Sequence, residues 1–390
     1  MRYGPLVARL ALDGSDGWNV HFRAVERKAR GIDTLILTVG DSDFDSPPEA
    51  VAACKAALDA GETRYTPILG DPRLRAAVAE RHARQTGRET SADQVVIAAG
   101  AQNALFSVVI SLLGPGEEAI VPEPMYLTYP GTVATAGGVM VVVPSPAERA
   151  FHVDPADIEK AVTPNSRLLL IASPNNPTGA VLGRAEWQAI GEIARAHDLW
   201  LVSDEVYADL AYGDSPAYPA ALPELAERTV VVSSLSKSHA MTGWRAGWSV
   251  SPNPELPRHL FRLAIANTYG SPQFVQDAAL AALKAAPAAL PALREAYARR
   301  RLEVAAAVNA IPGLSCRKPE GGMFVLVDVR QSGLGALEFA NRLLDETGLA
   351  LLPADGFGAS ATGHLRLNLG TPDAVLKDAM KRLAGFAATL

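Results

Sequence analysis

Short, continuous apolar segments alternate with segments of helical length over most of this chain, and this alternation limits the possible folds more than any other feature. The apolar segments contain few interspersed polar residues, which is typical of strands buried on both faces of a sheet. Strands are predicted at residues 35–39, 95–98, 118–121, 139–143, 168–171, 199–202, 230–232 and 247–250, and helices at about 48–60, 101–113 and 184–197. The region from about residue 50 to 280 is therefore predicted to be an α/β unit, a mostly parallel sheet covered by helices.

The pattern changes after Ser271, where a long helix rich in Ala, Arg and Glu is predicted at about residues 288–309. A smaller α+β unit follows, with strands predicted at 323–327 and 365–369 and helices at about 335–347 and 373–387. We expect the N-terminal segment to pack with this unit. The expected division is a large domain of residues 48–280 and a small domain built from both chain ends, residues 1–47 and 281–390.

The composition argues against several classes of protein. The chain has 36 Lys and Arg against 42 Asp and Glu, a net charge of −6, which argues against nucleic-acid binding. Pro5, Arg9 and Asp13 interrupt the N-terminal apolar run before it could form a signal-peptide core, and no apolar run approaches the roughly 18 residues of a membrane span. The only cysteines are Cys54 and Cys316, too few for a disulfide scaffold, so we expect a cytoplasmic location.

Two glycine patterns match the dinucleotide-binding motif only superficially. Residues 114–119 precede a predicted strand and residues 356–361 run into another, whereas the motif requires the order strand, turn, helix. The histidines show no metal-binding spacing, and His239 and His364 are expected to be a loop residue and a strand-start residue. Neither a nicotinamide site nor a metal site is predicted.

Polar clusters follow several of the predicted strands, at the edge where open α/β sheets bind ligands. They are Gly100-Ala101-Gln102, the segment Ser173 to Gly179, Asp204-Glu205-Val206-Tyr207, and Ser234-Leu235-Ser236-Lys237 with Arg245 further on. Each alone also fits a structural role, since Asp204 could cap a helix and Lys237 could be a solvated loop residue. Their combination and order indicate a binding site.

In this order the clusters resemble the class I and II aminotransferases, the fold-type-I family that uses pyridoxal 5′-phosphate (PLP). Further matches are residues 37–44, Tyr65-Thr66-Pro67 with Gly70, Pro124-Met125-Tyr126 and Arg366-Leu367-Asn368-Leu369. The run from Ser234 to Arg245 is the most specific part, and the resemblance covers essentially the whole chain. It implies the fold-type-I architecture, a PLP cofactor and transfer of an amino group.

The resemblance also implies roles for single residues around the cofactor. Lys237 would form the Schiff base with PLP and act as general base, so we expect a lowered pKa, favoured by the cationic pyridinium and by Arg245. Asp204 would keep the pyridine nitrogen protonated. Tyr207 and Asn176 would bind the phenolic oxygen of the cofactor, and Tyr126 would stack on its ring.

Anionic groups of cofactor and substrate would be held by further residues. The phosphate would be bound by Gly100, Ala101, Gln102, Ser234, Ser236 and Arg245. Arg366 would bind the substrate α-carboxylate, with Asn176 and the Gly40 backbone. Tyr65 would reach the phosphate of a neighbouring subunit, which implies a homodimer with shared active sites.

Within the family, residues 238–245, 269–277 and 321–325 are most similar to arginine–pyruvate transaminases. We therefore expect transfer from L-arginine, or another basic or polar amino acid, to a 2-oxo acid such as pyruvate. Acidic residues that could read a basic side chain are Asp13, Asp16, Asp41 and Asp43. A PLP-dependent lyase or decarboxylase, and an aminotransferase of aspartate, aromatic or alanine specificity, remain alternatives.

One segment departs from the family pattern. Residues 40–44 read Gly-Asp-Ser-Asp-Phe, where many relatives have Gly-Glu-Pro-Asp-Phe. Without the proline, we expect Ser42 to leave this loop looser over the active site. Glu205 is expected to be structural, because neighbouring residues of an extended segment face opposite ways.

Overall fold

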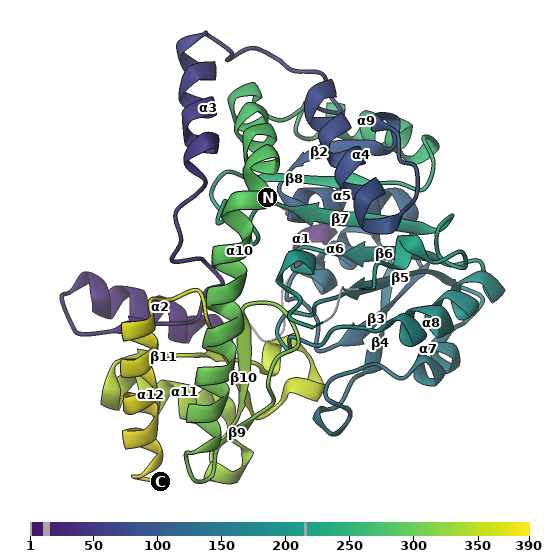
Figure 1. Ribbon diagram of the computed structural model, residues 1–390. Coiled ribbons are helices and arrows are strands. Elements are labelled where there is room, and N and C mark those ends of the chain that lie inside the picture. Colours follow the sequence, from purple (N-terminus) through teal and green to yellow (C-terminus); the bar gives the residue numbers. More distant parts are fainter. Residues whose placement is uncertain (1, 11–15, 214–216) are drawn as a thin grey trace.

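The computed structural model describes residues 2–10, 16–213 and 217–390, and within them a seven-stranded sheet has the order β2-β8-β7-β6-β5-β3-β4 (Figure 1). Its strands are β2 (Val95–Ala99), β3 (Glu118–Glu123), β4 (Val139–Pro144), β5 (Ser166–Ala172), β6 (Trp200–Asp204), β7 (Thr229–Ser234) and β8 (Ala246–Val250). Strand β8 runs antiparallel to β2 and β7, and the other pairs are parallel. The predicted strands and the mostly parallel sheet are confirmed.

Helices on both faces explain why these strands have continuous apolar sequences. One face is covered by α5 (Ala101–Leu112), α6 (Tyr129–Ala136) and α9 (Glu255–Ala266), and the other by α4 (Pro72–Thr86), α7 (Pro155–Ala161) and α8 (Arg184–Ala196). In β7, Val230 and Val232 belong to the core under the first face and Val231 to the core under the second. Every position of such a strand loses solvent contact, so every position favours an apolar or small residue.

The long helix α10 (Gln273–Asn309) spans 37 residues and joins both halves of the molecule (Figure 1). It begins at Gln273, so the predicted start near residue 288 is wrong. Ala278 and Ala282 pack in a core beside the seven-stranded sheet together with Ala50 of α3 (Pro48–Asp59), whereas Tyr297 packs in the C-terminal core. Small alanines let α10 and α3 approach closely. The Ala-rich stretch that begins after Ser271 is therefore the part of α10 that packs against α3.

The C-terminal unit contains a four-stranded antiparallel sheet, in the order β12-β13-β10-β9, among the residues described. Its elements are β9 (Ser315–Cys316), β10 (Phe324–Asp328), β12 (Leu352–Pro353), β13 (His364–Asn368), α11 (Ala336–Thr347) and α12 (Asp373–Ala387). His364 begins β13, as expected. No helix in the described part of the chain is long and apolar enough to cross a membrane.

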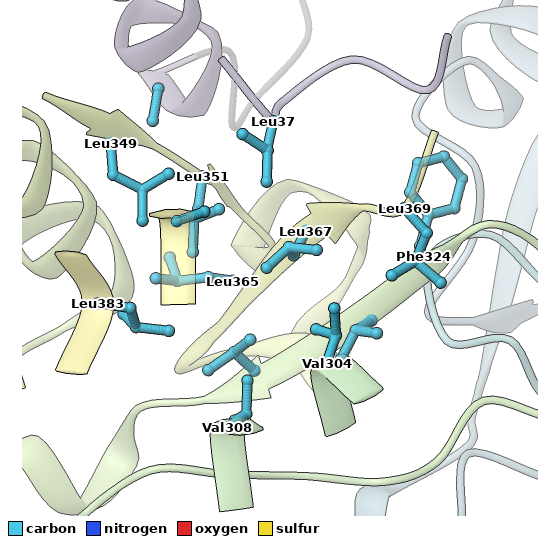
Figure 2. Packing of buried hydrophobic residues seen from close by; sticks show 14 of the residues in the cluster. Leu37, Val304, Val308, Phe324, Leu349, Leu351, Leu365, Leu367, Leu369 and Leu383 are labelled. Carbon is cyan, nitrogen blue, oxygen red and sulfur yellow. The ribbon is translucent and has the colours of Figure 1, made fainter. Parts of the chain in front are cut away.

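The N-terminal segment packs with this C-terminal unit, as the sequence led us to expect. Strand β1 (Leu35–Ile36) pairs in parallel with β11 (Leu349–Ala350), and helix α2 (Asp16–Ala29) contributes Val20 and Ala24 to the same core. Leu37 lies among Leu349, Leu351, Leu365 and Leu367 in that core (Figure 2). These contacts support the division into two domains that we propose. The strand predicted at residues 35–39 is shorter, because the chain beyond Leu37 leaves the sheet to cover a cavity.

Candidate active site

The carboxyl ends of the parallel strands face a cavity of about 310 Å³ that is also lined by residues of the C-terminal unit. Its walls contain most of the side chains that the sequence analysis selected. These are Gly40, Ala101, Gln102, Tyr126, Asn176, Asp204, Tyr207, Ser234, Ser236, Lys237, Arg245 and Arg366. The fold therefore brings together polar residues that lie far apart in the sequence.

Lys237 follows β7 and points into the cavity from its floor. Its Nζ donates a hydrogen bond to the carbonyl oxygen of Gly40 at 2.5 Å. The pKa of Lys237 is lowered to about 8, mainly by burial; the charge of Asp41 opposes this lowering, and the positive charges of Arg366 and Arg245 add to it. The expected lowering is confirmed in direction, although burial contributes more than any neighbouring cation. At neutral pH this amine is neutral far more often than an ordinary lysine.

Asp204, at the end of β6, is a partly buried carboxylate that accepts hydrogen bonds on both oxygens. Oδ2 accepts a bond from the Tyr129 hydroxyl at 2.7 Å, and Oδ1 accepts one from the Val206 amide at 3.2 Å. Burial raises the pKa of Asp204, and these two bonds partly offset that rise. Tyr129 was not among the residues selected from the sequence; it begins α6, three residues after Tyr126, and the two rings pack edge-on with centroids 6.1 Å apart.

The N-terminus of α5 and Arg245 form a cradle suited to an anion. Gly100 precedes the helix with φ of 84°, and a Cβ there would lie 2.3 Å from Arg245 Nη2. A Cβ at Gly247 would lie 2.5 Å from the Ala101 amide nitrogen, so both glycines permit close packing behind the helix end. Ser234 and Ser236 line the same cavity. Backbone amides at a helix N-terminus and a guanidinium are the groups that bind phosphate.

Arg366 extends from β13 into the opposite wall and is buried. It donates to Asn176 Oδ1 at 3.0 Å and to the Thr38 carbonyl oxygen at 2.7 Å. Its guanidinium lies 4.3 Å from the Phe324 ring centroid and 5.0 Å from that of Phe357. Its Nε has no hydrogen-bond partner, and no carboxylate pairs with this side chain among the residues described. Burial lowers its pKa to about 10, so Arg366 is a cation that lacks a counter-charge.

Two tyrosines complete the centre of the cavity. Tyr126 and Tyr207 both line it, and burial raises the pKa of each hydroxyl, so both are neutral donors at physiological pH. The Tyr207 ring packs edge-on against Phe324, with centroids 5.9 Å apart. The charges of Arg366, Asp204 and Arg245 also act on the pKa of Tyr126, although burial has the largest effect.

Two residues of interest lie outside the cavity. Tyr65 is 88% exposed and packs against Tyr269, with ring centroids 5.2 Å apart. Glu205 is buried beneath the site, where it accepts a hydrogen bond from Ser203 at 3.0 Å, and burial raises its pKa to about 7. Glu205 therefore faces away from Asp204, as expected from its position in an extended segment.

The cavity also contains residues that the sequence analysis did not select: Trp18, Val39, Leu127, Thr128, Thr242 and Phe324. Most are apolar; Val39, Thr242 and Phe324 lie within segments that carry the family resemblance, whereas the others come from segments without a recognisable motif. Trp18 lies on α2 and stands edge-on to His21, which bonds the hydroxyl of Thr38 at 2.7 Å. No sequence signal distinguishes such residues from ordinary core positions, since their role depends on the tertiary contact alone.

The loop at Ser42, which we expected to be looser without the proline, is held by two hydrogen bonds. The Ser42 hydroxyl bonds the Tyr297 hydroxyl at 2.7 Å and accepts a bond from the Phe44 amide at 3.2 Å. A proline would restrict the backbone through its ring; the serine restricts it through two hydrogen bonds. Among the acidic candidates, Asp43 pairs with Arg300 at 2.7 Å, whereas Asp41 is exposed at the rim and accepts a bond from Thr242. Asp13 lies outside the described residues.

Comparison with known proteins agrees with this geometry. The family model "Aminotransferase class I and II" matches residues 32–383. An arginine–pyruvate transaminase of Pseudomonas aeruginosa is 47% identical over 390 residues, covering 100% of this chain and 99% of the relative. An aspartate/prephenate aminotransferase of Cereibacter sphaeroides is 36% identical over 94% of each chain.

Solved structures match equally well. The aspartate aminotransferase of Thermus thermophilus with maleate is 35% identical and superposes with a TM-score of 0.93, covering 99% of this chain and 100% of that one. The aromatic aminotransferase of Pyrococcus horikoshii is 34% identical with a TM-score of 0.88, covering 94% and 99%. Fold and site thus define a fold-type-I transferase. The chain belongs to the class I and II aminotransferase family and is an aminotransferase.

Proposed function

We propose that this aminotransferase uses PLP to move the amino group of an L-amino acid to a 2-oxo acid. One observation carries the proposal: a single cavity combines a partly buried lysine of lowered pKa, a partly buried carboxylate and a buried arginine without a counter-charge. These are the groups needed to bind an aldehyde, a pyridinium and an α-carboxylate. Family membership supports the same cofactor, because the class I and II aminotransferases generally depend on PLP.

The residues present fit this cofactor. The glycines at 100 and 247 let the Arg245 guanidinium and strand β8 pack closely against the N-terminus of α5, and the amides of that terminus together with Arg245 would hold the phosphate. Asp204 lies in the same cavity as Lys237, so a ring between them would meet a carboxylate on one side and an amine on the other. When bound, PLP supplies an aldehyde that condenses with amines and a ring that accepts the electron pair released at the substrate Cα.

Each of three residues would then have a separate role in the reaction: Lys237, Asp204 and Arg366. Lys237 has the lowered pKa required of an amine that would bind the aldehyde carbon, would be displaced from it by the substrate amine, and would then as a free amine take the proton from the substrate Cα. Asp204 would hold the proton on the pyridine nitrogen, with Tyr129 orienting its carboxylate. Tyr207 and Asn176 would bind the phenolic oxygen, and Tyr126 would cover the ring. Arg366 would bind the α-carboxylate through its guanidinium.

For the substrates, we propose L-arginine or another basic or polar amino acid as donor and a 2-oxo acid such as pyruvate as acceptor. The support is the 47% identity to a relative named arginine–pyruvate transaminase. We propose that Asp41, at the rim, binds the basic side chain of the donor, since Asp43 is already paired with Arg300. Other relatives are named for aspartate, prephenate or aromatic substrates, so these specificities remain alternatives for this chain.

We further propose a cytoplasmic homodimer with shared active sites. Tyr65 is almost fully exposed in the single chain and lies outside its own cavity, which suits a residue that reaches the phosphate bound by a second subunit. Burying exposed aromatic rings such as Tyr65 and Tyr269 is a favourable contribution to association. Size-exclusion chromatography with light scattering tests the assembly.

The decisive test is a transamination screen of the purified protein loaded with PLP. Each amino acid of a panel is offered with pyruvate or 2-oxoglutarate, and the new amino acid and new oxo acid are quantified. We expect matched amounts of both with a basic donor, and none in Lys237→Ala. Release of carbon dioxide or an elimination product, without a new amino acid, would instead establish a lyase or decarboxylase and contradict the proposal.

A further inference from the structure

A short loop, residues 40–44, begins at the wall of the cavity with Gly40, and this residue and the segment just before it bond two of the cations that line the cavity. We call it the Gly40 loop. Its first carbonyl oxygen, on Gly40, accepts the bond from Lys237 Nζ at 2.5 Å. Two residues earlier, the Thr38 carbonyl oxygen accepts a bond from Arg366 at 2.7 Å. The path of this backbone therefore determines where both cations lie.

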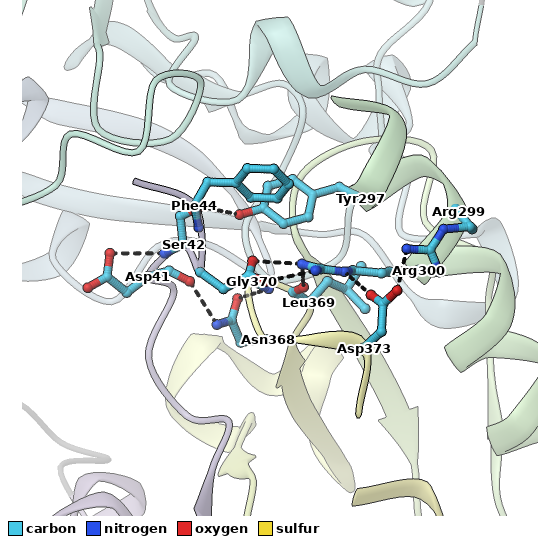
Figure 3. A network of polar contacts seen from close by, with 11 residues as sticks. Asp41, Ser42, Phe44, Tyr297, Arg299, Arg300, Asn368, Leu369, Gly370 and Asp373 are labelled. Carbon is cyan, nitrogen blue, oxygen red and sulfur yellow. Dashed lines mark hydrogen bonds and ion pairs between the residues drawn. The ribbon is translucent and has the colours of Figure 1, made fainter. Parts of the chain in front are cut away.

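Arg300 of α10 holds the Gly40 loop from behind, away from the cavity. Its guanidinium binds both oxygens of Asp43 at 2.7 Å, and Nε binds Asp373 at 2.7 Å. Nη1 also donates to the carbonyl oxygen of Leu369 at 3.1 Å, three residues after Arg366 in the chain (Figure 3). The Arg300 side chain is 7% exposed, so these bonds form in a site with little competing water.

A second contact from α10 holds the same loop. Tyr297 lies one helical turn before Arg300, and its hydroxyl bonds the Ser42 hydroxyl at 2.7 Å. The Tyr297 ring packs edge-on against Phe44, with centroids 6.1 Å apart, and Arg300 lies over both rings at 5.8 Å (Figure 3). Neighbouring positions of one helix face thus fix the loop at Ser42, Asp43 and Phe44.

The Gly40 loop also lies directly against the end of β13. Asn368 donates its side-chain amide to the Asp41 carbonyl oxygen at 3.0 Å and its backbone amide to the Leu37 carbonyl oxygen at 3.0 Å. A Cβ at Gly370 would lie 2.0 Å from the Asp41 carbonyl oxygen, so only glycine allows this approach. Arg300 contacts both partners of this junction, through Asp43 and through Leu369.

We propose that Arg300 is a positioning residue that fixes the Gly40 loop against the end of β13 and thereby aims Arg366 at the substrate α-carboxylate. Arg300 does not line the cavity, so it acts through the loop and the strand. The inference rests on the proposed function, because it assumes that Arg366 binds a carboxylate. It assigns to Tyr297 and Ser42 the restraint that a proline supplies in relatives.

The test compares Arg300→Lys with the matched control Arg299→Lys in the PLP-loaded enzyme. Arg299 is the exposed neighbour; it also pairs with Asp373 but does not touch the loop. A lysine at position 300 cannot bind both Asp43 oxygens and two further acceptors, so we expect KM for the amino donor to rise about 10-fold with kcat within about 3-fold. Arg299→Lys should leave both constants within about 2-fold.

An inert ligand supplies a readout that does not depend on turnover. An α-methyl amino acid carries the carboxylate but no Cα proton, and its dissociation constant is measured from the absorbance of the bound cofactor. We expect that constant to rise in parallel with KM in Arg300→Lys. The inference is overturned if both constants stay unchanged in a folded variant, or if Arg299→Lys raises them equally. Absence of transamination by the wild type would instead refute the proposed function.

If Arg300→Lys does not fold, Tyr297→Phe tests whether α10 positions the Gly40 loop. This variant keeps the ring and removes only the bond to Ser42, so it preserves the packing against Phe44. We expect KM and the inert ligand's dissociation constant to rise about 3-fold, the effect of one lost neutral hydrogen bond. Unchanged values for Tyr297→Phe would also overturn the inference.

Discussion

Arg366 and Arg300 are both buried arginines of this protein, yet their surroundings are opposite. Arg300 has two carboxylates and a carbonyl around its guanidinium, and these ion pairs raise its pKa although burial alone would lower it. Arg366 has two neutral acceptors, an unpartnered Nε and aromatic rings on its flanks, and burial lowers its pKa to about 10. Arg300 is thus neutralised by carboxylates of the fold, whereas Arg366 has no counter-charge among the described residues.

The difference shows how a buried charge can be assigned to binding or to structure. A buried charge is normally paired, because leaving it unpaired is costly. Asp204 follows the pattern of Arg366: it is partly buried, bonded to neutral donors and without a cationic partner among the described residues. The charges that lack a partner line the cavity, whereas the pair of Arg300 and Asp43 lies behind it.

The largest expected effect is on catalysis when Arg366 is replaced. In Arg366→Met, kcat/KM for the amino donor should fall about 10³-fold, because the bond to the α-carboxylate is lost. The free energy of unfolding should stay within about 1 kcal/mol of the wild type, since removing an uncompensated charge offsets two lost hydrogen bonds. Steady-state kinetics and urea unfolding measure the two quantities. A variant that is strongly destabilised would break the comparison.

Arg300→Met, in contrast to Arg366→Met, should mainly lower the stability of the fold. Arg300→Met leaves Asp43 without its cation in a site where that side chain is only 14% exposed. We expect the free energy of unfolding to fall by about 3 kcal/mol, measured by urea unfolding at neutral pH. The matched control is Arg299→Met, whose ion pairs are about half exposed and should contribute less than about 1 kcal/mol. Equal losses in both variants would contradict our assignment of Arg300.

Tyr129→Phe extends the comparison to the unpaired carboxylate. Without the hydroxyl, Asp204 loses its 2.7 Å donor and its pKa should rise further. We expect kcat to fall about 10-fold, the effect of one hydrogen bond to a charged group. Tyr218→Phe, which removes a hydroxyl bonded to Gln85 at 3.2 Å, is the control. A normal kcat in Tyr129→Phe would show that Asp204 needs no orienting partner.

The smallest expected effect concerns pH. Because the pKa of Lys237 is lowered to about 8, its neutral amine forms as pH rises through that value, and covalent capture of PLP by the apoprotein should accelerate up to about pH 8 and then level off. Stopped-flow absorbance gives this profile. Arg366→Met removes a positive charge that lowers the pKa of Lys237, so its midpoint should move upward, whereas that of Arg299→Lys should not move. A midpoint near 10 in the wild type would contradict the role of burial.

Local sequence predicted the sheet well because burial on both faces affects every residue of a strand such as β7. It also located Lys237, Asp204 and Arg366, which lie within motifs. Contacts between distant segments could not be predicted, because Asp43 and Arg300 are 257 positions apart and either could have been a solvated charge. Tyr129 was missed for the same reason, since its partner is 75 positions away.

Helix α10 has one further consequence, which follows from two prolines. Pro287 and Pro291 lie between Ala282, in the core beside the seven-stranded sheet, and Leu293, in the core of the C-terminal unit. Proline has no amide hydrogen, so two carbonyl groups of this segment lack their helical donor. Because Arg300 lies beyond these prolines, its bonds attach the Gly40 loop and the end of β13 to the half of α10 that packs in the C-terminal core.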